Sequence, residues 1–71
     1  MITIEQKKDF KAWYKVWCET CPKTLEIGDS HEDKIGEEAI TLLMATASRH
    51  ERLHPKHNIT LFLYEKKHES Q

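Results

Sequence analysis

Apolar and polar positions near the start of the chain follow the spacing of an amphipathic helix. Thr3 and Gln6 form a capping-box pattern, which predicts that a helix begins near residue 4. Large apolar side chains then recur every three or four residues until Pro22, where the pattern stops because the residue before a proline disfavours helical backbone. We therefore predict a first helix over about 4–20. The aromatic residues on its apolar face are Phe10, Trp13, Tyr14 and Trp17.

A second helical pattern fills the middle of the chain. Ser30, with Asp33 three residues later, can cap it, and apolar or small residues then cover more than half of the helix circumference as far as Leu53. This pattern predicts a helix over about 31–53. A helix with so wide an apolar surface is normally central in its domain or buried in an oligomer.

Two further segments have the alternation of β-strands. Residues 58–65 are apolar on both faces when they are read as a strand, so we expect a C-terminal strand that is covered on both sides. Leu25 and Ile27 alternate with polar residues, which predicts either a short strand at 23–27 or a loop. The expected fold class is α+β, with two amphipathic helices, the C-terminal strand and, where 23–27 is extended, a short second strand.

The length of the chain limits its stability. A chain of 71 residues forms a single small domain, 1–71, and a domain of this size usually needs a metal, disulfides or oligomerisation to be stable. The second helix has too wide an apolar surface for one small domain, and the C-terminal strand lacks an obvious long partner. These two features indicate a homodimer.

Charge and hydropathy bear on partners and location. The chain has 11 basic and 12 acidic residues and a formal net charge of −1, whereas a general nucleic-acid binder needs a clear basic excess. We therefore expect no nucleic-acid partner. No apolar run approaches the ~20 residues of a membrane span, so we also expect no membrane association. The lack of a signal-peptide pattern and the presence of only two cysteines favour a cytoplasmic location, where thiols stay reduced.

The two cysteines, Cys18 and Cys21, carry the main chemical signal. Their two-residue gap is typical of structural zinc sites. His50 and His54 are four residues apart, so both imidazoles would lie on one face of the second predicted helix. The four side chains together would form a tetrahedral zinc site, which would compensate for a small core.

Two other interpretations of the cysteines compete with zinc. As free thiols they would lie on or beside the aromatic stripe of the first predicted helix and pack as small hydrophobic residues, and the pattern favours this packing role. The segment from Trp17 to Lys23, WCETCPK, resembles the active-site segment of thioredoxin-family proteins, which implies thiol redox chemistry. In that family the motif opens a helix, whose N-terminus lowers the thiol pKa. Here the cysteines would close a helix, where the dipole raises the thiol pKa.

The rest of the sequence indicates binding rather than catalysis. The two glycines are isolated, so the chain has no phosphate-binding loop, and no nucleophile motif is present. We expect a non-enzymatic protein-interaction module, a regulator or inhibitor of a larger protein, of the type common among accessory proteins of phages and mobile elements. The alternatives are a zinc-stabilised binding module and a thiol redox protein. The side chains expected to bind the protein partner are Trp13, Tyr14, Trp17 and Tyr64.

Overall fold

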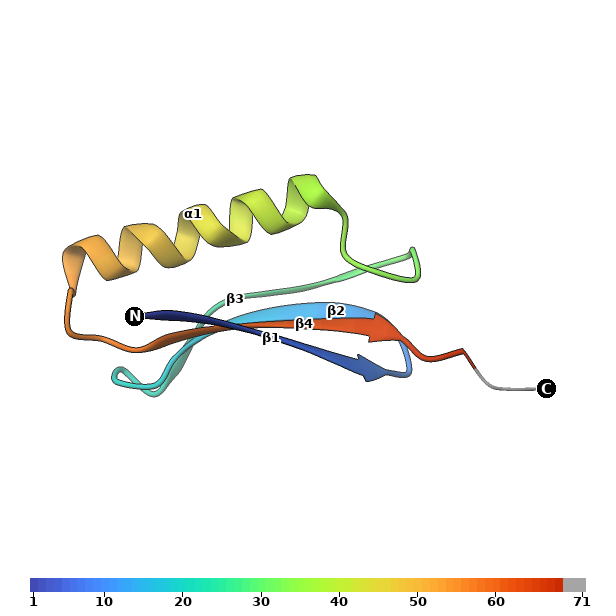
Figure 1. Cartoon of the computed structure of the whole chain (residues 1–71), viewed down its shortest axis with the longest axis horizontal. Coiled ribbons are helices and arrows are strands. Elements are labelled where there is room, and N and C mark those ends of the chain that lie inside the picture. Colours follow the sequence, from blue (N-terminus) through green and yellow to red (C-terminus); the bar gives the residue numbers. More distant parts are fainter. Residues whose placement is uncertain (69–71) are drawn as a thin grey trace.

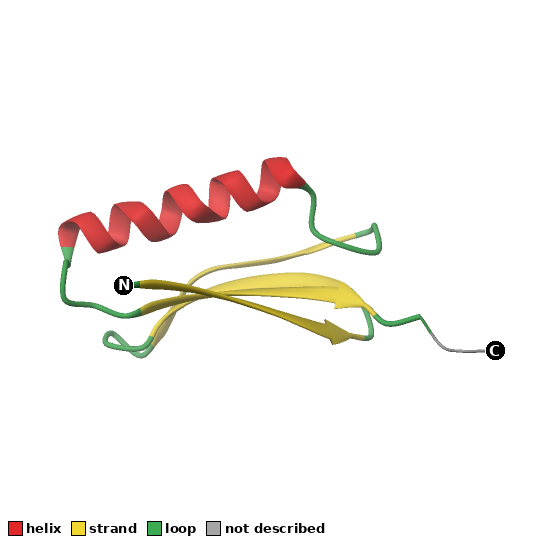
Figure 2. Ribbon diagram, viewed as in Figure 1, coloured by secondary structure: helices red, strands yellow, loops and turns green. Residues whose placement is uncertain are grey.

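The computed structural model describes residues 1–68, which form one helix and a four-stranded mixed sheet (Figure 1). The elements follow the order β1 (Ile2–Asp9), β2 (Ala12–Cys18), β3 (Lys23–Ser30), α1 (Glu37–Leu53) and β4 (Ile59–Lys66). The strand order in the sheet is β1-β4-β2-β3, in which β1 and β4 are parallel and the other neighbouring pairs are antiparallel. The helix α1 lies along one face of this sheet (Figure 2).

The predicted fold class is wrong, because the first predicted helix, 4–20, is in fact β1, a two-residue connection and β2. Trp13 and Trp17 are four residues apart, and this spacing places two side chains on one face of either a helix or a strand. The burial of β2 decides between them, since Ala12, Val16 and Cys18 are buried while the intervening Trp13 and Trp17 are only partly buried. Aromatic and β-branched residues also favour strands.

The second predicted helix, 31–53, also starts too early. The helix α1 begins at Glu37, and its N-cap is Gly36, which provides no side-chain hydrogen bond. An irregular connection, 31–36, precedes α1, and the strand before it, β3, continues to Ser30 and so is longer than the short strand predicted at 23–27. The strand β4 begins one residue later than the predicted 58–65. Gly28 is tolerated inside β3 because the Tyr14 ring packs across it, where a Cβ atom would overlap the ring.

The core lies between the sheet and α1, and the two central strands, β2 and β4, supply most of it. Burying one large aliphatic side chain of this kind contributes about 1.5–3 kcal/mol. The opposite face of the sheet carries no helix or strand within residues 1–68 (Figure 2), so β4 is covered on one side only. The buried apolar residues are Ala12, Val16, Cys18, Ile35, Leu43, Ala47, Ile59, Leu61 and Leu63.

Candidate metal centre

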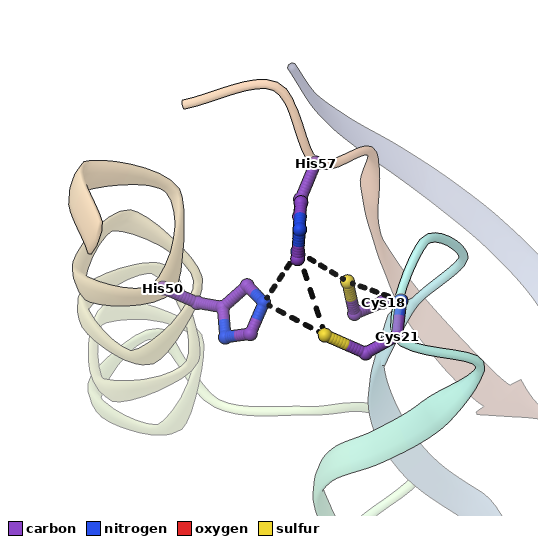
Figure 3. Close-up of side chains that lie close together, drawn as sticks. All are labelled: Cys18, Cys21, His50 and His57. Atoms are coloured by element: carbon purple, nitrogen blue, oxygen red, sulfur yellow. Dashed lines mark hydrogen bonds between the residues drawn. The ribbon is translucent and has the colours of Figure 1, made fainter. Parts of the chain in front are cut away.

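Three segments of the chain meet at one end of the molecule, where the β2–β3 turn, the C-terminal end of α1 and the loop before β4 come together (Figure 1). Cys18 is the last residue of β2 and Cys21 lies in the following turn. His50 is in the last turn of α1, and His57 lies in the loop that precedes β4. Figure 3 shows that the two thiols and the two imidazoles point toward one another.

The four donor atoms form a compact cluster. The Cys21 Sγ atom lies 3.4 Å from His57 Nδ1 and 3.6 Å from His50 Nε2. The Cys18 Sγ atom lies 3.5 Å from His57 Nδ1, and the two imidazole nitrogens, His50 Nε2 and His57 Nδ1, are 3.3 Å apart. All four donor atoms lie within 4.8 Å of one another, so the cluster can hold a metal ion.

These separations match the edges of a tetrahedron around zinc. Zinc bonds of about 2.3 Å to sulfur and about 2.0–2.1 Å to nitrogen, at tetrahedral angles, place sulfur and nitrogen about 3.5–3.6 Å apart and two nitrogens about 3.3–3.4 Å apart. Three of the four sulfur–nitrogen separations and the nitrogen–nitrogen separation agree with these values within about 0.2 Å, and all the donor atoms lie within 4.8 Å of one another. Four of the six donor-atom separations therefore already fit a tetrahedral metal site.

Backbone hydrogen bonds fix the turn that carries the cysteines. The Cys21 N–H donates to Cys18 Sγ at 3.3 Å, which closes the turn between the two cysteines. The Glu19 N–H donates to the Asn58 carbonyl oxygen at 2.9 Å, and the Asn58 N–H donates to Thr20 Oγ1 at 3.1 Å. Because this turn is bonded to Asn58, the neighbouring His57 is held beside the thiols.

The chain reverses direction after α1, and this reversal selects the second histidine. The His54 N–H donates to the His50 carbonyl oxygen at 2.9 Å, and the His57 N–H donates to the His54 carbonyl oxygen at 3.0 Å. His54 is the C-cap of α1, with φ −135° and ψ 76°, so its backbone has left the helix. Its ring lies outside the cluster and stacks on the ring of His57, with centroids 4.6 Å apart.

The structure thus brings Cys18, Cys21 and His50 together and places His57 beside them, where the sequence pattern had pointed to His54. The spacing rule for His50 and His54 assumes that the helix continues through both residues. Pro55, immediately after His54, is the sequence signal that the helix ends before the rule applies. His57, two residues beyond this proline, was the other candidate ligand in the sequence. Its position beside the thiols depends on contacts with the β2–β3 turn, which the sequence pattern does not reveal.

Partial burial shapes the protonation of the cluster. Desolvation, reinforced by the nearby His54 and His57, lowers the pKa of His50, which favours the neutral imidazole that binds metals. Desolvation also raises the pKa of the Cys21 thiol, and the adjacent Cys18 adds to this effect. A bound divalent cation would reverse this rise in the pKa of the Cys21 thiol, because a thiol that coordinates a metal loses its proton.

The surroundings of the cysteines differ from those of a thioredoxin-like motif. Both cysteines are free thiols, and Cys18 is fully buried. The motif leads from β2 into β3 rather than into a helix, so it lacks the helix N-terminus that lowers a thiol pKa in redox proteins.

The four side chains predicted to bind a protein partner do not share one surface. The alternation along β2 and β4 puts Trp13, Trp17 and Tyr64 on the sheet face away from α1. Tyr14 lies on the other face and packs against the hydrophobic core. The three exposed-face residues therefore form one surface, to which Tyr14 does not contribute.

Comparisons with protein-family models, with curated proteins and with solved structures found no match for this chain. Within residues 1–68, no helix has both the length and the apolar character that crossing a bilayer requires.

Proposed function

We propose that this chain is a small zinc-stabilised binding module in which Cys18, Cys21, His50 and His57 hold one Zn²⁺ ion. The observation that carries this proposal is the clustering of two thiols and two imidazoles, in which four of the six donor-atom separations agree with a zinc tetrahedron. Two thiolates with two imidazoles at tetrahedral positions form a ligand set that selects zinc over harder divalent ions.

The ligand set supports a structural role for the ion. Four protein ligands fill a tetrahedral zinc site and leave no position for the water molecule that a catalytic zinc activates. The ion would join the β2–β3 turn to the end of α1 and to the loop before β4, which both come much later in the sequence than the turn. A domain of 71 residues buries too little apolar surface to dispense easily with such a link. We therefore take the module to be non-enzymatic.

Metal content tests the proposal directly. Native mass spectrometry of the purified chain should show one zinc ion per chain, which a strong chelator removes. Replacing zinc by Co²⁺ should give the intense visible absorption of a tetrahedral cobalt site, together with sulfur-to-cobalt charge transfer in the near ultraviolet. A chain that carries no metal and gives no such spectrum when cobalt is added would refute the proposal.

Acidification should weaken zinc binding. In the metal-free chain the pKa of the Cys21 thiol is raised above its ordinary value of 9.0, so the thiol is protonated near neutral pH and must release a proton to bind zinc. For each proton that a ligand must release on binding, the apparent affinity for zinc falls by about tenfold when the pH falls by one unit. Competition with a chromophoric chelator between pH 8 and pH 6 should measure this loss, and an affinity that stays constant over that range would contradict it.

A further inference from the structure

The sheet face that points away from α1 gathers aromatic side chains from the two central strands. Trp13 and Tyr64 are register partners on β2 and β4, and their rings are stacked, with centroids 4.2 Å apart and planes within 2° of parallel. The ring of Phe62 follows along β4, with its centroid 6.2 Å from that of Tyr64. Trp17, on β2, is the fourth aromatic residue on this face. All four side chains are partly exposed, although they occupy the centre of the sheet.

A lysine stands in the middle of these rings. Lys15 lies between Trp13 and Trp17 on β2 and opposite Phe62 on β4. Its Nζ atom is 5.4 Å from the centroid of the Trp17 ring and 5.3 Å from that of the Phe62 ring, within the range of cation–π interactions. None of the ion pairs formed within residues 1–68 involves Lys15.

The acidic groups on the same face already have partners. The Asp29 carboxylate lies 3.0 Å from Lys11 Nζ, and the Asp9 carboxylate accepts a hydrogen bond from Trp13 Nε1 at 2.8 Å. Glu5 lies 3.7 Å from Lys7. Lys15 itself forms no ion pair within residues 1–68, so its ammonium group can accept an anionic partner. The expectation of no nucleic-acid partner rested on the net charge of the whole chain, which does not describe this one position. This face therefore carries four partly exposed aromatic side chains and a positive charge together.

A second copy of this chain fits this face poorly. A two-fold symmetric interface centred on the aromatic rings would bring Lys15 close to the same residue of the other copy. Two like charges would then lose water without gaining an anionic partner, which is unfavourable. The chemistry of the face calls instead for a partner that carries both planar rings and negative charge.

We propose that this face binds single-stranded nucleic acid, with bases stacked on the aromatic side chains and a backbone phosphate at Lys15. Aromatic rings beside a cation are the combination by which proteins hold single strands with little sequence preference, because every base has a flat face. A duplex keeps its base faces stacked inside, so this face should select single strands.

A hollow beside Trp13 provides a place for one base. It has a volume of about 260 Å³ and is lined by Lys11, Trp13, Ile27, Gly28 and Asp29, on the side of Trp13 that faces β3. The other side of the Trp13 ring is taken by Tyr64. A base that entered this hollow would extend the Tyr64–Trp13 stack by one ring.

The test uses the full chain saturated with zinc and relies on its tryptophans. The chain has two tryptophans, Trp13 and Trp17, and both lie on the proposed face, so a stacked base should quench the intrinsic fluorescence. Titration with an oligothymidylate at low salt should give saturable quenching. A duplex of equal length should bind more weakly than the single strand, by at least about tenfold. The slope of log K against log salt concentration should be shallow, about −0.7 for each phosphate contacted.

Two variants and one matched control make the test specific. Phe62→Leu keeps an apolar side chain but removes the ring, and Lys15→Glu reverses the charge. Each should weaken binding by roughly tenfold or more, the scale of one lost base–aromatic stack. Lys34→Glu makes the same charge change in the connection before α1, away from this face, and should alter the affinity by less than about twofold. Circular dichroism confirms that each variant is folded.

Several outcomes would overturn the proposal: no quenching by any single strand, equal affinity for the duplex, or equal binding by Lys15→Glu and Lys34→Glu. A dimer that Phe62→Leu dissociates, in a chain that binds no oligonucleotide, would assign the face to a protein partner instead. None of these residues belongs to the metal cluster. The zinc content of the variants therefore stays a separate measurement, and failure here would leave the zinc proposal standing.

Discussion

Replacing His57 by alanine should abolish tight zinc binding and the cooperative thermal unfolding of this chain, whereas replacing His54 by alanine should preserve both. The two residues lie in the same loop, and their rings stack on each other, but only His57 places a nitrogen within the cluster of thiols. Structural zinc contributes about 10–16 kcal/mol of apparent binding free energy in small zinc-finger peptides. This is as large as the whole stability of an ordinary domain, about 5–15 kcal/mol.

The measurement is thermal unfolding followed by circular dichroism, with zinc and with excess chelator. The His54→Ala variant should match the original chain in both conditions, while His57→Ala should resemble the chelated chain even when zinc is present. Cys21→Ser should behave like His57→Ala, because it removes another of the four donor atoms. Equal melting curves for the two histidine variants would show that the stacked imidazoles, rather than the metal, hold this loop in place.

Leu61→Ala should destabilise the zinc-loaded chain by about 2–5 kcal/mol. Leu61 is fully buried at the centre of β4, where its register partners are Ile4 on β1 and Val16 on β2. Truncation would leave a cavity beneath α1, because neighbours on both sides are fixed by strand pairing. Such a loss is a large fraction of the stability that a domain of 71 residues can have.

Urea unfolding at saturating zinc would measure this effect. Leu42→Ala is the matched control, because it makes the same change on α1 at a side chain that is 69% exposed, and it should shift the free energy of unfolding by less than about 0.5 kcal/mol. If both variants lost equal stability, the core would not lie between β4 and α1 as described.

Local sequence patterns predicted some parts of this molecule and misled about others. The cysteine spacing and the helical position of His50 are local features, so they could be recognised without a structure. The first predicted helix was wrong because Trp13 and Trp17 fit a helix and a strand equally well. The strand β1, which forms the first part of that segment, has few apolar residues that could show the alternating pattern of a strand. It is held by parallel pairing with β4, which lies more than fifty residues away in the chain. Sequence periodicity carries no information about such a distant partner.

The choice of histidine failed for a related reason. Spacing along a helix predicts which side chains share a face only as long as the helix continues, and α1 ends at Leu53. Beyond that point the position of His57 is set by hydrogen bonds between Asn58 and the β2–β3 turn. Those bonds connect segments that the sequence alone does not place together.

The position of β4 in the sheet also determines when the chain can fold. This strand comes last among the elements, yet it lies between β1 and β2, which come first. During synthesis β1 therefore has no neighbour to pair with until residues 59–66 leave the ribosome, and His57 emerges only just before them. Sheet formation and completion of the ligand set should consequently occur in one late step, with the slow rate expected when contacts span most of the chain. Until that step β2 can pair only with β3, and its other edge, which later pairs with β4, stays open.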